Sequence, residues 1–226
     1  MSGGGDGSPA ATSVIAIDGP GGSGKSTVAR AVSERLGYRH LDTGAMYRAV
    51  TLLVLRAGVL GEDEATAELA GAMTLEVNGT VVLNGEDVSS AIRTPEVDAA
   101  VSEVSAIPAV RAILVERQRA WAAAGDGAVV EGRDIGSVVF PDAALKVFLT
   151  ANPAERVRRR LEQLGPWSDD GGETRPTEQT ALSLARRDDL DTSRAASPLK
   201  VADGAIVVDS TGRSVDEVVK EVLSYL

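Results

Sequence analysis

The chain of 226 residues contains no cysteine and only one histidine, His40. Without cysteine it can form no disulfide, no thiolate metal site and no cysteine nucleophile, and a single histidine cannot build a histidine-rich metal centre. Its apolar runs fall far short of the ~20 residues that a membrane-spanning helix needs, so we expect no membrane association. The first twelve residues also lack the basic and apolar regions of a signal peptide. These absences exclude zinc chemistry and predict a soluble, cytoplasmic protein with a flexible tail over residues 1–12.

Basic residues are outnumbered, 23 against 33 acidic residues, which gives a formal net charge of −10. A general nucleic-acid-binding protein presents a basic surface, so we expect no nucleic-acid partner. Lysine is especially scarce, since 19 of the 23 basic residues are arginines. We attribute most of this ratio to a preference for arginine codons. Individual arginines remain candidates for anion binding, because a planar guanidinium holds phosphate or carboxylate through two hydrogen bonds.

The chain does contain a complete phosphate-binding pattern, G-x-x-x-x-G-K-[ST], from Gly19 to Ser26. The apolar run 14–17 before it predicts a buried strand, and residues 26–36 after it predict a helix with one apolar face. A glycine turn between a strand and a helix N-terminus aims backbone N–H groups at one point, where the helix dipole favours a phosphate. Lys25 is expected to reach the β- and γ-phosphates, and the Ser26 hydroxyl is expected to ligate Mg²⁺. The residues predicted to bind a nucleoside triphosphate here are Gly19, Pro20, Gly21, Gly22, Ser23, Gly24, Lys25, Ser26 and Thr27.

Short apolar segments alternate with helical patterns along the rest of the chain. Further strands are predicted at 39–42, 128–131, 145–149 and 205–209, and helices at 45–57, 154–164, 177–191 and 215–225. This alternation predicts an α/β fold with a five-stranded parallel sheet and helices on both faces. Ligands of such sheets bind at the carboxyl ends of the strands. The glycine loop, residues 42–43, residues 132–134 and Thr150 should therefore meet in one cleft.

Two segments break the alternation. Residues 74–88 contain two apolar stretches joined by Asn78-Gly79 and followed by Asn84-Gly85, which predicts a small hairpin sheet. Helical patterns follow at 95–106 and 109–124, so we interpret 61–125 as an insertion in a single domain spanning 13–226. The polar segment 165–176, rich in glycine and proline, is predicted to be a mobile loop at the tip of a lid region spanning 155–190.

A phosphate loop alone leaves a GTPase switch, a motor ATPase and a small-molecule kinase open. The guanine-reading motif N-K-x-D is absent from the sequence. The insertion and the lid favour a kinase that closes over a small acceptor, because water at the γ-phosphate would hydrolyse the triphosphate without transfer to the acceptor. Among kinases, shikimate kinases are shorter and lack the long insertion, and adenylate kinases lack the Asn-Gly hairpins. A nucleotide-dependent switch protein remains the alternative from another class.

Several motifs, in order, resemble those of the bacterial cytidylate kinases, and the likeness runs from about Ser13 to the C-terminus. The matching segments are residues 17–20, 41–48, 89–95, 131–136, 139–142 and 187–194. The resemblance implies a P-loop kinase with a nucleoside-monophosphate-binding insertion and a lid. It implies phosphoryl transfer from ATP, with Mg²⁺, to CMP or deoxy-CMP, by an enzyme that we expect to be a monomer.

The resemblance also assigns roles to individual residues. It places Thr43, Arg48, Arg133 and Arg194 on the acceptor phosphate, Ser102, Arg111 and Asp134 on the base, and Asp191, oriented by Arg187, on the ribose; Tyr47 also belongs to the CMP site. Lys25, Arg133 and Arg194 are the expected catalytic residues. The acceptor is already an oxyanion, so positioning and charge neutralisation suffice and no general base is needed. A carboxylate facing the cytosine N4 amine would reject uracil, whose O4 is an acceptor, so Asp134 is the expected discriminator.

Three arginines, Arg156, Arg159 and Arg160, recur at i, i+3 and i+4 and should share one helix face, while Arg158 points elsewhere. Like charges on one face repel unless a polyanion lies between them, so we predict that these three arginines clamp ATP, with a solvated basic face as the alternative. Glu131 ends an apolar run at the place of a Walker-B-type acid, and we expect it to orient Mg²⁺ through water. His40 lies within a short strand, and we expect its role to be structural.

Overall fold

The computed structural model describes residues 13–164, 177–194 and 197–226. The predicted flexible tail 1–12 and the predicted mobile loop 165–176 lie outside these residues. A five-stranded sheet with the strand order β2-β6-β1-β7-β8 forms the core, and every pairing in it is parallel, which confirms the predicted fold class. Its strands are β1 (Ser13–Asp18), β2 (Arg39–Asp42), β6 (Gly127–Gly132), β7 (Leu145–Thr150) and β8 (Ile206–Asp209).

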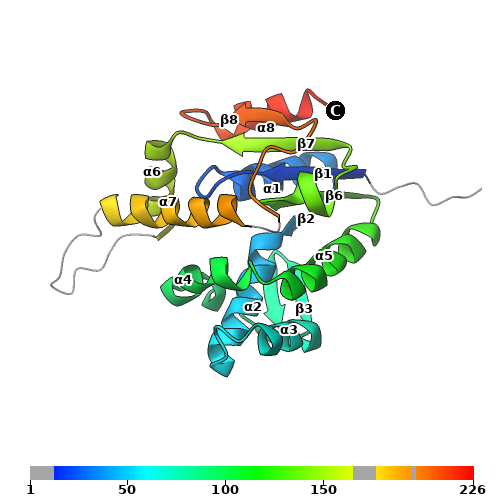
Figure 1. The fold of residues 1–226 in the computed structure, drawn as a ribbon. Helices are drawn as coiled ribbons and strands as arrows, with labels where there is room; N and C mark the ends of the chain where they lie inside the picture. Colours follow the sequence, from blue (N-terminus) through cyan, green and yellow to red (C-terminus); the bar gives the residue numbers. More distant parts are fainter. Residues whose placement is uncertain (1–12, 165–176, 195–196) are drawn as a thin grey trace, which may run out of the picture.

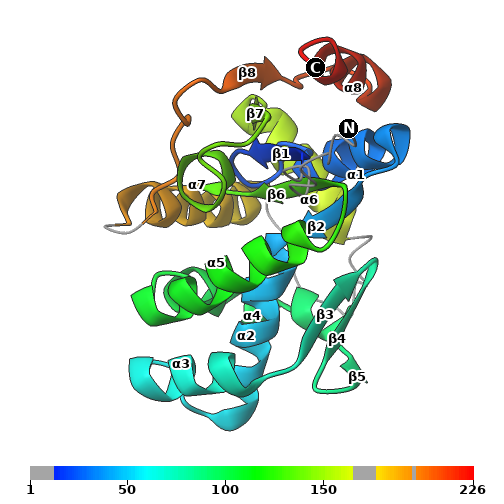
Figure 2. The same ribbon diagram turned by 90° about the vertical axis from the view of Figure 1, so that its right-hand side faces the viewer.

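Helices cover both faces of this sheet because both faces are apolar. Ile15 and Ile17 of β1 face α1 (Lys25–Leu36) and α8 (Val215–Leu223), whereas Val14 and Ala16 face the opposite way, toward α2 (Thr43–Ala57). Successive strand residues point to opposite faces, so a run that is buried on both sides must be apolar throughout. Figures 1 and 2 show β1 in the interior of this layered core.

The predicted insertion forms a compact unit below the sheet in Figures 1 and 2. Its elements are α3 (Asp63–Ala72), β3 (Leu75–Asn78), β4 (Thr80–Leu83), β5 (Glu86–Asp87), the 3₁₀ turn η1 (Ala91–Arg93), α4 (Pro95–Val104) and α5 (Pro108–Ala123). The antiparallel order β3-β4-β5 confirms the predicted small sheet, and Gly79 and Gly85 turn its corners with φ of +79° and +85°. The helix α3 was not predicted from the sequence, because its buried residues are only Thr66 and Ala70, too few for a clear apolar stripe.

Two helices, α6 (Pro153–Leu164) and α7 (Thr177–Ser193), lie at the carboxyl ends of the strands, at the left of Figure 1. They are packed against each other, and α7 also contacts α4 of the insertion. The helix α7 therefore touches both parts of the molecule.

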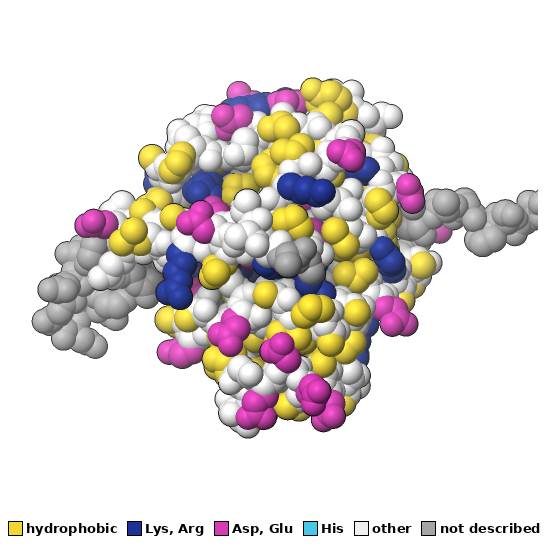
Figure 3. All heavy atoms as spheres, in the orientation of Figure 1, with side chains coloured by type: hydrophobic (Ala, Val, Ile, Leu, Met, Phe, Trp, Pro, Cys, Tyr) yellow, Lys and Arg dark blue, Asp and Glu magenta, His cyan; other side chains and the backbone are white. Residues whose placement is uncertain are grey.

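Acidic side chains gather at the lower end of the face drawn in Figure 3. Glu62, Asp63, Glu64 and Glu68, in and beside α3, are all exposed. Part of the acidic excess of the chain thus lies on the insertion, away from the sheet. Within the described ranges, no helix has the length and apolar character that crossing a bilayer would require.

Candidate functional site

The glycine loop between β1 and α1 has a backbone that only glycine allows at two key positions. A Cβ added to Gly19 would lie 2.0 Å from the carbonyl oxygen of Leu149, so the loop passes directly against β7. Gly22 has φ of +75°, in the left-handed region that L side chains avoid. The helix α1 begins at Lys25, and its N-cap residue, Gly24, has no side chain to cap the first turn. The amides of that turn are available to an anion.

Lys25 lies within the curve of this loop. Its Nζ donates a hydrogen bond to the carbonyl oxygen of Pro20 at 2.8 Å, which holds the ammonium at the loop's centre. Burial, together with the charge of the nearby Arg133 guanidinium, lowers the pKa of Lys25 to about 7. An incoming phosphate would stabilise the charged form of this amine.

Ser26 and Glu131 face each other across the end of the sheet. The Ser26 hydroxyl donates to Glu131 Oε2 at 2.8 Å, so the Glu131 side chain reaches the first residue after the loop's lysine. Burial raises the pKa of Glu131, and the neighbouring Asp42 raises it too. Glu131 Oε1 lies 3.1 Å from His40 Nε2, so His40, expected to be only structural, contacts the acid of the site and lines its cavity.

This pair fits Mg²⁺ held mainly by a nucleotide. In the described part of the chain, no group of three or more His, Cys, Asp or Glu side chains is arranged to hold a metal ion. Mg²⁺ is commonly bound by one or two protein oxygens together with waters and substrate phosphates. A serine hydroxyl beside a carboxylate next to a phosphate loop matches that donor set.

One cavity of about 440 Å³ joins the phosphate loop to the predicted acceptor residues. The predicted residues in its wall are Gly21, Gly22, Gly24, Lys25, Ser26, Thr27, Thr43, Tyr47, Arg48, Ser102, Arg111, Glu131, Arg133, Asp134, Arg160, Arg187, Asp191 and Arg194. A second cavity of about 480 Å³ lies behind the loop, and Ser23 and Arg159 line it. Gly19, Pro20 and Arg156 line neither cavity, although all three hydrogen-bond to residues of the site.

In the cavity that joins the phosphate loop to the acceptor residues, Arg111 and Asp134 form a buried ion pair. Burial raises the pKa of Asp134, and the Arg111 charge opposes that rise. The guanidinium of Arg111 also lies 5.5 Å from the centre of the Tyr47 ring and donates to the Ser105 carbonyl at 3.3 Å. The three residues predicted to read the base, Ser102, Arg111 and Asp134, therefore lie along one pocket wall.

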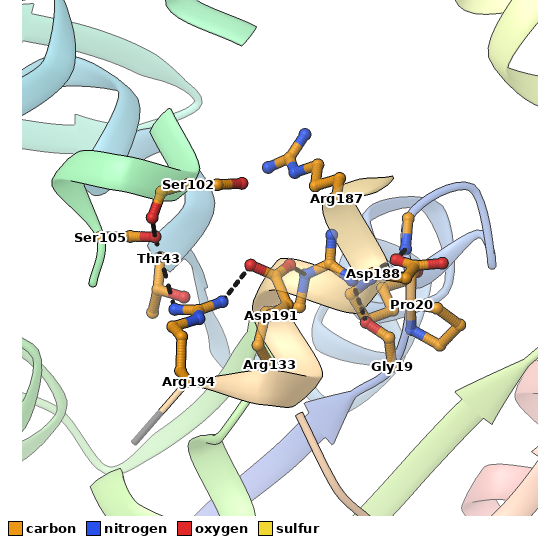
Figure 4. Close-up of polar contacts among 12 residues, drawn as sticks. Gly19, Pro20, Thr43, Ser102, Ser105, Arg133, Arg187, Asp188, Asp191 and Arg194 are labelled. Atoms are coloured by element: carbon orange, nitrogen blue, oxygen red, sulfur yellow. Dashed lines mark hydrogen bonds and ion pairs between the residues drawn. The ribbon is translucent and has the colours of Figure 1, made fainter. Parts of the chain in front are cut away.

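Asp191 lies between the two predicted catalytic arginines. Its carboxylate is 3.1 Å from Arg133 Nε and is paired with Arg194, which also reaches the Ser105 hydroxyl at 3.4 Å (Figure 4). Arg187, expected to orient Asp191, lies close enough for the Asp191 charge to raise its pKa. Its ion pair is with Asp98, at 3.8 Å. Burial lowers the pKa of Arg187 to about 9, with Arg48 and Arg133 adding to the effect.

Asp98 of α4 forms ion pairs with three arginines, each from a different helix. Arg48 Nη2 lies 2.8 Å from its carboxylate, and Arg160 and Arg187 contact it as well. Asp98 was not predicted from the sequence, although it lies one helical turn before Ser102 and so shares its face. Arg160, predicted to clamp ATP with Arg156 and Arg159, contacts Asp98 of the insertion and also lines the cavity that contains the phosphate loop.

The other arginines of α6 behave differently from Arg160. Arg156 donates to the Gly21 carbonyl at 3.2 Å and Arg159 to the Ser23 carbonyl at 3.1 Å, so both lie on the phosphate loop. Arg158 instead pairs with exposed Glu162 and with Glu155, so it points elsewhere than Arg156, as expected, and lines the second cavity.

Two further acids of the site were missed. Asp18, at the end of β1, accepts hydrogen bonds from the amides of Ile135 at 2.7 Å and Gly136 at 2.8 Å, which fixes the segment after Asp134. Burial raises the pKa of Asp18 to about 6. Asp188 accepts from the Gly21 amide at 3.1 Å. Both lie inside motifs that carried the family resemblance, which was the available signal.

Comparison with known proteins agrees with that resemblance. A family model described as cytidylate kinase matches residues 15–226. A cytidylate kinase of Mycobacterium leprae (strain Br4923) is 49% identical over 218 residues, covering 94% of this chain and 95% of that protein. Those of Pelotomaculum thermopropionicum and Symbiobacterium thermophilum are 48% and 47% identical, covering 93% and 94% of this chain and 94% and 95% of theirs. The similarity therefore includes every element of the described site.

Proposed function

The chain belongs to the cytidylate kinase family, and we propose how its site performs the reaction of that family. The enzyme transfers the γ-phosphoryl group of ATP to CMP or deoxy-CMP, giving ADP and CDP or deoxy-CDP. One observation carries the proposed mechanism: the phosphate loop with Lys25 and the buried Arg111–Asp134 pair open into the same cavity of about 440 Å³.

The donor is assigned to the phosphate loop. Its triphosphate would accept hydrogen bonds from the loop amides and from Lys25, with Arg156 and Arg159 beside it. The second cavity, lined by Arg159, Ser210 and Arg213, would take the rest of the nucleotide. Bound Mg²⁺, held by the Ser26 hydroxyl and oriented by Glu131, would neutralise charge on the phosphates.

The acceptor is assigned to the opposite side of the cavity. Arg133 links the two sides, because its Nη1 donates to the Gly19 carbonyl at 3.1 Å while its Nε faces Asp191. Arg48 and Arg194 lie farther from the loop and would hold the monophosphate, with Thr43. The protein's work in the transfer step is to align two anions and neutralise their charge.

Base selection is assigned to Asp134. Its carboxylate would accept a hydrogen bond from the cytosine N4 amine, and the Arg111 charge favours the ionised form of that carboxylate against its burial. Uracil presents an oxygen at the same position, so two acceptors would face each other without a proton between them.

The proposed function is tested by ADP release with ATP and Mg²⁺ in the presence of CMP, deoxy-CMP, UMP, AMP or shikimate. We expect strong stimulation by the cytidine nucleotides, and no stimulation by shikimate. In Asp134→Asn, the side-chain amide can donate to uracil O4, so kcat/KM for CMP should fall about 10- to 100-fold while that for UMP rises relative to it.

The matched control is Asp142→Asn, which makes the same charge change at an exposed site. Thermal unfolding of both variants measures the loss of stability caused by leaving Arg111 buried without its partner. This loss can then be told apart from a change of specificity. An unchanged ratio of UMP to CMP use in Asp134→Asn would remove Asp134 from base selection. A rate of ADP release that is the same with and without each acceptor would favour a nucleotide-dependent switch.

At alkaline pH, the protein should take up a proton when ATP binds. With a pKa of about 7, Lys25 is charged below neutrality and largely neutral above it, whereas phosphates in the loop favour its charged form. We expect ATP affinity to fall by up to about tenfold per pH unit above pH 7, with uptake of about one proton at pH 8. Calorimetry in two buffers of different ionisation enthalpy measures this uptake. Zero uptake at pH 8 would mean that Lys25 is already charged before ATP arrives.

A further inference from the structure

A carboxylate lies on the phosphate loop itself. Asp188 Oδ1 accepts a hydrogen bond from the Gly21 amide at 3.1 Å, and Figure 4 shows the side chain directed at the loop beside Pro20. Amides of such loops are the groups that bind phosphate oxygens, since they point outward from the turn and carry partial positive charge. Asp188 therefore presents an anion where the loop is built to receive one.

Two guanidinium groups complete the surroundings of this carboxylate. Arg133 Nη1 lies 3.3 Å from Asp188 Oδ1, and Arg156 is paired with Oδ2. Both arginines also donate to loop carbonyls, those of Gly19 and Gly21. One amide and two guanidinium groups around a carboxylate form the same kind of donor set that holds a phosphoryl group.

The contact is supported by packing along α7. Leu184, one turn before Asp188, is buried against the loop, and its Cδ2 would lie 3.1 Å from a Cβ added at Gly21. Residues four apart share a helix face, so Leu184 and Asp188 approach the loop together. The side chain of Asp188 is only 16% exposed, whereas the next residue, Asp189, is exposed.

We propose that Asp188 is an internal competitor of the donor phosphates. Before ATP binds, its carboxylate holds the Gly21 amide, Arg133 and Arg156; ATP must displace it to use those groups. This inference rests on the proposed assignment of ATP to the loop. Two anions cannot use the same donors at once, so ATP binds only the molecules in which Asp188 does not occupy the loop. The apparent affinity for ATP is therefore the intrinsic affinity multiplied by the fraction of such molecules.

The test is calorimetric binding of inorganic tripolyphosphate and of a non-hydrolysable ATP analogue to the full chain. Asp188→Asn keeps the shape of the side chain and an acceptor oxygen but removes the charge, so both ligands should bind about tenfold more tightly. Asp189→Asn removes the same charge from the same helix at an exposed site and should leave both affinities unchanged. Asp188→Ser, a smaller uncharged residue, should act in the same direction if Asp188→Asn fails to fold.

Several outcomes overturn the proposal. Weaker binding in Asp188→Asn would mean that the carboxylate assembles the arginines for the donor, and unchanged binding would mean that it does not compete. Equal tightening in Asp188→Asn and Asp189→Asn would reduce the effect to overall charge. Failure of the unmodified enzyme to bind either ligand would instead contradict the proposed donor site, which separates the two hypotheses.

Discussion

Replacing Lys25 with alanine will lower kcat for CMP phosphorylation by about 10³-fold or more, because a preorganised cation on the transferred group contributes about 4 kcal/mol to transition-state stabilisation. The Nζ of Lys25 is held by the Pro20 carbonyl at the centre of the loop, so no neighbouring side chain can take its place without moving. The fold should survive, since the change removes a partly buried charge that burial already disfavours.

The measurement is steady-state kinetics together with thermal unfolding. Lys220→Ala, an exposed lysine on α8, is the matched control and should behave like the unmodified enzyme. The proton uptake expected on ATP binding at pH 8 should disappear in Lys25→Ala alone. Activity within about tenfold of the unmodified enzyme would contradict the assignment of Lys25 to the γ-phosphoryl group.

Replacing Arg133 with glutamine will lower kcat by about 10²- to 10³-fold and will also raise KM for CMP. Arg133 is the guanidinium that touches both sides of the cavity, through the Gly19 carbonyl and Asp191, so it is placed to face the phosphoryl group in transit. An interaction made only with that group appears in kcat, whereas a contact with bound CMP appears in KM.

Two further variants make this prediction specific. Arg133→Lys keeps the charge but not the fork of donors, so it should recover part of kcat. Arg35→Gln changes an exposed arginine of α1 that pairs with exposed Asp216 and lines neither cavity, so it should leave both constants unchanged. If Arg133→Gln raises KM while kcat stays within about threefold, the residue binds CMP without acting on the transfer step.

The site illustrates how far local sequence patterns reach. The phosphate loop was predictable because its glycines, Lys25 and Ser26 are fixed by one short turn whose backbone only glycine permits at Gly22. The presence of Arg48, Arg133 and Asp134 in one cavity was predictable because they follow strands of a parallel sheet, whose carboxyl ends meet at one edge. The pairing of Arg111 with Asp134 could not be predicted in this way, because the two residues lie on different elements, and only the family resemblance pointed to Arg111.

The choice of ion-pair partners was not predictable in the same way. Arg187 lies four residues before Asp191 on α7, a spacing that suits a local pair, yet its carboxylate partner is Asp98 on the insertion. Arg160 shares a helix face with Arg156 but also reaches Asp98. Long arginine side chains select among several acids within reach, and which acids are within reach depends on how the helices pack.

By itself, the sequence determined the phosphate loop, the strand segments, the Asn-Gly turns of the insertion and the absence of thiol chemistry, because each depends on neighbouring residues or on composition. The tertiary structure alone decided the strand order β2-β6-β1-β7-β8, the gathering of arginines on Asp98 and the position of Asp188 on Gly21. These features join residues as much as 167 positions apart, through backbone amides and charges whose proximity no local pattern encodes.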